Sequence, residues 1–204
     1  MNTYIYDKVK GVMRLLPLHL FALLFLMVSC SETDDSVEEF ANWRETNETF
    51  FNLLYEEASA LEEQGSTEWK VFKKWSLLDS LATTPDKHVV VKVLRSGSAD
   101  AGTPAYTDSV KVSYEGHLLP SASFPSGYVF DKSYYGDFDL STAHPSAFAV
   151  SGVIEGWITV LQAMHPGDYW EVYIPYTLGY GTSASGSIPA YSTLVFTIYL
   201  HSYW

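Results

Sequence analysis

One helical pattern stands among strand patterns in the stretch "SGVIEGWITVLQAM", residues 151–164. Val153 and Ile154 are β-branched and favour extended chain. The apolar residues that follow have the i, i+3, i+4, i+7 spacing of one helix face: Trp157, Val160, Leu161 and Met164. The flanking segments read as short strands: 87–94, 108–116, 127–133, 146–150, 168–175 and 193–200. An antiparallel sheet wrapped on one short helix satisfies this order, so we predict an α+β domain over residues 86–204.

The first 29 residues have the pattern of a signal peptide. A basic start precedes a mostly apolar stretch, and "MVSC" ends at Cys30, the only cysteine of the chain. This resembles the lipobox of bacterial lipoproteins, which predicts lipidation of Cys30, a signal peptide over 1–29 and an acidic tether over 30–36. The alternative is an ordinary secreted protein with an incidental cysteine. We therefore expect a cell-envelope protein, lipid-anchored at the outer membrane of a Gram-negative bacterium, on its periplasmic face or its surface.

Residues 37–85 predict an N-terminal helical segment. Ser36 with Glu39 forms a capping box, an amphipathic pattern runs over 37–64, and Gly65 stands at the C′ position. The face comprises Phe40, Trp43, Asn47, Phe50, Leu54, Ala58 and Leu61. A short second helix is expected within 67–86. These helices either pack on the domain that follows, or use their aromatic residues to form a homodimer through 37–64 or to grip clients.

Composition excludes several classes of function. The chain has 24 acidic and 12 basic residues and no basic patch, so we expect no nucleic acid partner. The six histidines make no metal-ligand spacing with one another or with Cys30, and no phosphate-binding loop or dinucleotide fingerprint occurs. No serine nucleophile elbow is present either. We therefore predict no metal and no cofactor, and chemistry that needs no nucleophile.

Four short pieces then occur in a fixed order. They are "VSYEG" with Tyr114, "YVFDKS" with Phe130 and Asp131, "VIEGW" with Trp157, and "LGYG" with Tyr180 followed by "SIPAYSTLVFTIYL". This order resembles the FKBP-type peptidyl-prolyl cis-trans isomerases, over residues 87–200. Within that family, "VSGVIEGWITVLQAM" and "GDYWEVYIP" look most like the macrophage-infectivity-potentiator and periplasmic branch, whose members also carry helices before the domain.

The residues suit the activity that the resemblance implies. Rotation about an X-Pro amide faces a barrier of about 18–20 kcal/mol because resonance holds the amide planar. Twisting leaves a less polar carbonyl, so an apolar, aromatic pocket that withholds water favours the twisted state. Such catalysis needs no acid, base or nucleophile. The expected substrates are proline-containing, unfolded or partly folded exported polypeptides.

The resemblance also implies a role for each site residue. Trp157 would be the pocket floor beneath the proline ring. The backbone N–H of Ile154 and the hydroxyl of Tyr180 would hold substrate carbonyls, and Asp131 would orient the site. The walls would be Tyr114, Phe130, Val153, Ile188 and Phe196.

Some features depart from minimal members of the family. Ser146 stands where they carry an aromatic wall, and 117–129 and 132–147 are longer, which predicts insertions that extend client binding or cover the pocket. These departures favour an alternative, a non-catalytic chaperone or adaptor of the same fold that binds apolar client segments. A structural envelope protein with a vestigial pocket is a third class. Asp131, Trp157 and Tyr180 favour the enzyme.

Overall fold

The computed structural model describes residues 38–204, and these form one sheet with two α-helices. The strands are β1 (Trp69–Lys73), β2 (His88–Arg95), β3 (Ser109–Leu118), β4 (Val129–Lys132), β5 (Ser146–Ala149), β6 (Tyr169–Ile174) and β7 (Leu194–Tyr203). The helices are α2 (Trp43–Glu63) and α3 (Glu155–Leu161). The sheet order is β1-β2-β6-β7-β3-β4, with β5 also paired to β3. Every pairing is antiparallel, and the predicted α+β class is confirmed.

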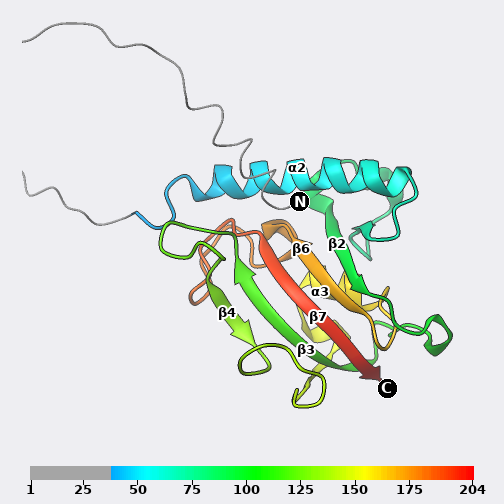
Figure 1. Cartoon of the computed structure of the whole chain (residues 1–204). Helices are drawn as coiled ribbons and strands as arrows, with labels where there is room; N and C mark the ends of the chain where they lie inside the picture. Colours follow the sequence, from blue (N-terminus) through cyan, green and yellow to red (C-terminus); the bar gives the residue numbers. More distant parts are fainter. Residues whose placement is uncertain (1–37) are drawn as a thin grey trace, which may run out of the picture. The chain divides into compact units, whose positions relative to one another are not determined.

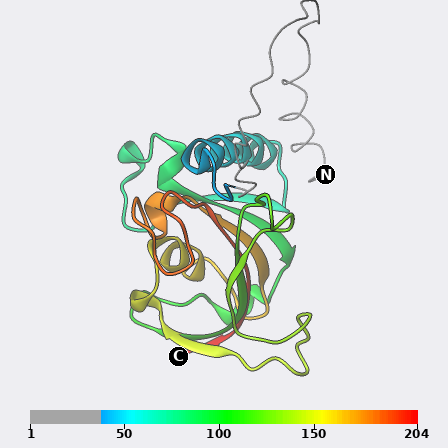
Figure 2. The same ribbon diagram turned by 90° about the vertical axis from the view of Figure 1, so that its left-hand side faces the viewer.

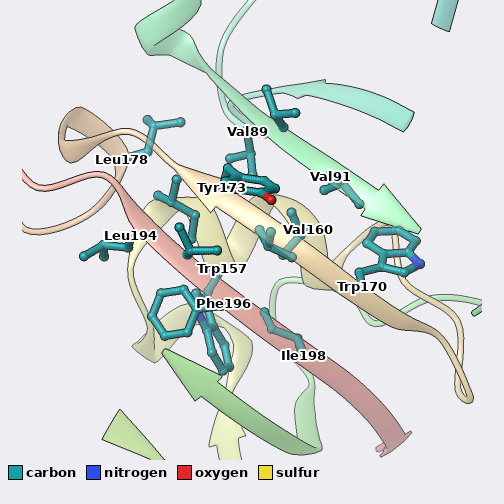
Figure 3. Packing of buried hydrophobic residues seen from close by; sticks show 14 of the residues in the cluster. Val89, Val91, Trp157, Val160, Trp170, Tyr173, Leu178, Leu194, Phe196 and Ile198 are labelled. Atoms are coloured by element: carbon teal, nitrogen blue, oxygen red, sulfur yellow. The ribbon is translucent and has the colours of Figure 1, made fainter. Parts of the chain in front are cut away.

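The sheet curves around α3, as the sequence predicts (Figures 1 and 2). The four residues of the predicted helix face, Trp157, Val160, Leu161 and Met164, are all buried. On β7, alternate side chains point into the same core because successive residues of a strand face opposite sides of a sheet. They are Leu194, Phe196, Ile198 and Leu200. Figure 3 shows Trp157 of α3 beside Phe196 of β7.

The α2 helix crosses the end of the sheet where β2 and β7 begin and β6 ends (Figure 1). Its C-terminus is the predicted one: Gly65 has φ +86° and donates to the carbonyl of Glu62 at 2.9 Å, while Ser66 donates to that of Leu61 at 2.9 Å. These two bonds form a Schellman motif. The left-handed backbone explains the glycine, since other residues adopt it at a cost.

The start of α2 differs from the prediction. Ser36 lies outside the described residues, and the helix begins at Trp43 because Asn42 has φ 52°, which is not helical. The Glu39 carboxylate, expected to cap the helix, accepts hydrogen bonds from the Ser121 hydroxyl and from the Ser123 amide at 2.9 Å. The side chain therefore holds a loop of the domain instead of its own helix.

The short second helix predicted within 67–86 is wrong. Residues 69–73 form β1, which pairs with β2 from Trp69↔Lys92 to Lys73↔His88. A short apolar run does not by itself distinguish a helix from a strand. Here residues 69–73 form a strand because they pair with the edge of β2. Two 3₁₀ turns follow, at Asp79–Leu81 and Pro85–Lys87.

Packing on the sheet also accounts for the apolar face of α2. Trp43, Phe51, Leu54 and Ala58 are buried in the same core as the strands. Trp43 and Leu54, which lie in the segment 37–64 through which a homodimer is predicted, are therefore covered by their own chain. The intramolecular alternative fits this structure.

Candidate functional site

All nine residues predicted for the pocket line one cavity of about 650 Å³. They come from separate parts of the chain: Tyr114 from β3, Phe130 and Asp131 from β4, Val153 and Ile154 from the turn before α3, Trp157 from α3, Tyr180 and Ile188 from the loop before β7, and Phe196 from β7. Cys30, the predicted lipidation site, lies outside the described residues.

Trp157 is the aromatic centre of the cavity. Its side chain is 4% exposed, and its ring centroid lies 5.2 Å from Tyr114, 5.2 Å from Phe196 and 5.9 Å from Phe148. All three contacts are edge-to-face, an arrangement that the aromatic quadrupole favours. The preceding residue must be small, because a Cβ on Gly156 would lie 2.4 Å from a methyl carbon of Ile174. Close approach of α3 to β6 thus fixes the indole in place.

A hydrogen bond joins two polar members of the site. The Tyr114 hydroxyl donates to Asp131 Oδ2 at 2.7 Å, between the neighbouring strands β3 and β4. Burial raises the pKa of Tyr114, and the hydrogen bond and negative charge of Asp131 raise it further. The phenol therefore stays protonated and keeps the carboxylate in one orientation.

The aromatic walls meet over a glycine. Phe130 and Phe196 pack edge-to-face with centroids 5.4 Å apart. A Cβ on Gly116 would lie 2.5 Å from Phe196 and 2.7 Å from Phe130, far inside the normal carbon–carbon distance. Absence of a side chain at this position of β3 is what allows both rings to line the cavity.

The open side of the cavity is formed by two chain segments. Tyr180 is 45% exposed, and burial followed by the charge of Asp131 raises the pKa of its hydroxyl. Ser185 and Ile188 exchange backbone hydrogen bonds of 2.9 and 3.0 Å, which brings Ile188 to the rim. Across the cavity, Ile154 is the residue before the first turn of α3. Within the described part of the chain, its backbone N–H has no protein acceptor.

Sequence reasoning missed five lining residues: Phe148, Gly152, Ser185, Gly186 and Ser187. Phe148 had a signal, since it follows the predicted gap at Ser146 by two residues, and its ring lies 5.9 Å from both Tyr114 and Trp157. The other four lining residues are glycines and serines, and their small size leaves the cavity open. The predicted gap is therefore partly filled from within β5.

Neither insertion contributes to the cavity in the described residues. In the 132–147 segment, Phe138 packs on Tyr169 at 5.1 Å and on Tyr199 at 5.6 Å, on the opposite side of the sheet from α3. Figure 2 shows this yellow-green loop away from the orange loop that precedes β7. The 117–129 segment is instead tied to Glu39. The expectation that the insertions cover the pocket is not met here.

Residues 38–204 contain no group of three or more histidine, cysteine, aspartate or glutamate side chains with the geometry of a metal site. No helix in the same range is long and apolar enough to cross a bilayer.

This fold and its aromatic cavity define a known class of protein. Residues 101–201 match the family model described as FKBP-type peptidyl-prolyl cis-trans isomerase. Residues 101–201 thus form a domain of this family, which confirms the resemblance seen in the sequence.

The relatives specify the branch. The FKBP-type 22 kDa peptidyl-prolyl cis-trans isomerase of Escherichia coli (strain K12) is 41% identical over 110 residues, which are 53% of this chain and 47% of that protein. The outer membrane protein MIP of Legionella longbeachae is 40% identical over 107 residues, 50% of this chain and 41% of that protein. The chain thus spans less than half the length of these relatives. The similarity is to the macrophage-infectivity-potentiator and periplasmic branch.

A solved structure agrees at the level of the fold. The crystal structure of the three FKBP domains of wheat FKBP73 superposes with a TM-score of 0.50 and 25% sequence identity. The match covers 67% of this chain and 51% of that one.

Proposed function

We propose that the protein is a peptidyl-prolyl cis-trans isomerase that binds the prolyl amide in the aromatic cavity. The observation that carries the proposal is the convergence of nine family-matched residues on one cavity around Trp157. The family match over residues 101–201 supports the same conclusion.

The cavity suits the reaction because most of the residues that line it are aromatic or aliphatic. A planar prolyl amide is charge-separated and well hydrated, whereas the twisted amide is less polar. Aromatic walls that exclude water therefore favour the twisted state over the ground state. Trp157 presents its ring to the pyrrolidine, with Tyr114, Val153 and Phe196 beside it.

Hydrogen-bond donors at the rim would orient the substrate. The Ile154 N–H would bind one carbonyl, and the Tyr180 hydroxyl, whose pKa is raised, would stay protonated and bind another. Asp131 is held by Tyr114 at 2.7 Å and places a carboxylate beside the twisting amide. Phe130 and Ile188 complete the walls on the open side.

The location proposed for this activity is the bacterial cell envelope. Cys30 would carry a lipid after removal of residues 1–29, and the acidic segment 30–36 would act as a tether before α2. The name of the Legionella relative, outer membrane protein MIP, supports this placement. Clients would be exported polypeptides that contain proline.

The test uses residues 31–204 and a short Phe-Pro reporter peptide, with Trp157→Leu as the variant. Trp170→Leu is a matched control, because Trp170 is also buried, at 2% exposure, but lies on β6 outside the cavity. We expect wild type and control to accelerate isomerisation, and the Trp157 variant to lose at least tenfold. A folded wild type without activity would refute the enzyme and favour the alternative, a client-binding chaperone or adaptor.

The predicted homodimer is tested separately. The outward side of α2 carries mainly polar and acidic side chains, among them Glu45, Glu56 and Glu57, which would repel their copies in a symmetric pair. We therefore expect residues 31–204 to sediment as a monomer. A dimer would mean that 37–64 associates through this outward side.

A further inference from the structure

The first half of α2 contacts the loop that forms the open side of the cavity. This helix lies outside the segment matched by the family, residues 101–201, and contributes no residue to the cavity lining. The loop runs from Gly181 to Thr193 and carries Ile188 and three small lining residues. Its composition, "GTSASGSIPAYST", provides few side chains that could hold it in place by packing.

Two buried polar side chains of α2 hold the end of this loop. The Trp43 indole N–H donates to Ser192 Oγ at 2.8 Å, and Ser192 in turn donates to the Pro189 carbonyl at 2.7 Å. Asn47, which is fully buried, accepts the Thr193 amide at 2.7 Å. A buried polar group is costly unless paired, so these bonds fix the loop end against the helix.

A second set of contacts holds Tyr191, which in turn is bonded to the beginning of the loop. Glu48 accepts the Tyr176 hydroxyl at 3.1 Å, and the Tyr176 ring packs edge-to-face on Tyr191 at 5.1 Å. The Arg44 guanidinium lies 4.7 Å from the centre of the Tyr191 ring. The Tyr191 amide donates to the Gly181 carbonyl at 3.0 Å, which closes the loop directly after Tyr180.

The backbone of Tyr191 shows that this arrangement is imposed. Its φ is +64°, a left-handed conformation that is unusual for a residue other than glycine. Such a conformation costs about 1 kcal/mol or more and persists only where the surroundings determine it. Here the contacts of Arg44 and Tyr176 supply those surroundings.

We propose that Asn47 and Trp43 are positioning residues of the prolyl site, which hold the 181–193 loop so that Tyr180 and Ile188 face the cavity. The inference rests on the proposed isomerase function. It makes α2 a working part of the substrate site, although the helix touches no substrate.

The expected effect is on substrate affinity. When a binding-competent state is only fractionally populated, the apparent dissociation constant rises by the inverse of that fraction. If release of the loop reduces the competent fraction to about 0.1–0.3, KM rises about three- to tenfold. Turnover of bound substrate stays within about twofold, because Trp157, Asp131 and Phe196 lie on other elements.

The experiment measures kcat and KM of residues 31–204 with the Phe-Pro peptide. Asn47→Leu keeps the branched shape of the side chain and removes both the acceptor for the Thr193 amide and the donor to the Trp43 carbonyl. Trp43→Phe keeps an aromatic ring in the core and removes the donor to Ser192 together with part of the indole volume. This variant decides the matter if the first one does not fold. Leu54→Ala is the control, since Leu54 is buried on the same face of α2 two turns later.

Hydrogen exchange of the Tyr191 amide provides a readout independent of activity. We expect the Tyr191 amide to be accelerated more than the sheet amides in Asn47→Leu and Trp43→Phe. In Leu54→Ala we expect the Tyr191 amide and the sheet amides to be accelerated equally, through global destabilisation alone. A KM raised equally by all three variants, or unchanged by the first two, would overturn the proposal. If the wild type is inactive, the isomerase proposal fails, while the exchange data still show whether α2 holds the loop.

Discussion

The substitution Gly116→Ala tests the architecture of the cavity with one methyl group. Gly116 lies on β3 beneath the point where the Phe130 and Phe196 rings meet. The added Cβ would stand 2.5 Å from Phe196 Cε1 and 2.7 Å from two carbons of Phe130, where contact requires roughly 3.5 Å or more. At least one ring must therefore move by about 1 Å.

The two rings differ in how easily they move. Phe196 is 4% exposed and is held by Trp157 at 5.2 Å. Phe130 is half-buried and lies on β4, a four-residue strand at the edge of the sheet, so it gives way first. Overpacking typically costs about 1–3 kcal/mol, and because Phe130 lies on an edge strand we expect a cost of about 1–2 kcal/mol here. For a domain of this size the melting temperature would fall by about 2–8 °C.

We expect kcat/KM to fall even at temperatures where the variant remains fully folded. Displacing an aromatic wall by about 1 Å misplaces the substrate, and we expect roughly tenfold lower kcat/KM on the Phe-Pro peptide at a temperature well below unfolding. Gly152→Ala is the matched control, because Gly152 also lines the cavity but its added Cβ would approach only Ala149, at an ordinary 3.8 Å. Wild-type kcat/KM in Gly116→Ala, or an equal loss in both variants, would refute this account of the walls.

Three further predictions follow from single contacts. Tyr114→Phe removes the donor to Asp131. We expect kcat/KM to fall several-fold in peptide kinetics and the unfolding free energy to fall by about 1–2 kcal/mol in urea titration. Wild-type values of both quantities would contradict this role of the hydrogen bond. Gly65→Ala should destabilise the protein by about 1 kcal/mol through the left-handed backbone and leave kcat/KM unchanged. Burial lowers the pKa of His201, so the unfolded chain binds more protons just below pH 6.5 and stability should fall as pH drops through that range. His201→Gln should flatten that pH dependence.

The sequence determined most of the elements of the domain. Strand patterns near 87–94, 108–116 and 193–200 became β2, β3 and β7 with small changes at their ends. The helix pattern after Gly156 became α3, and its four apolar residues are buried. These predictions succeeded because the period of apolar residues depends on the local geometry of helix or strand, which the chain carries in its own order.

The candidate site was also readable in large part. Each of the nine residues sits in a short piece matched to the family, and the structure brings all nine to one cavity. Phe148 was missed because β5 had to be placed against β3 before its ring could be seen beside Tyr114 and Trp157.

Only the tertiary structure decided three features. Residues 69–73 form a strand because they pair with the edge of β2. The Glu39 carboxylate accepts hydrogen bonds from Ser121 and Ser123 instead of capping its own helix. The Asn47 side chain meets the Thr193 amide across 146 positions of sequence. A repeating pattern predicts which face of an element is buried, but it contains nothing about which distant group that face will meet. Partners of this kind are set by the packing of the whole chain, where a buried donor or acceptor must find its complement.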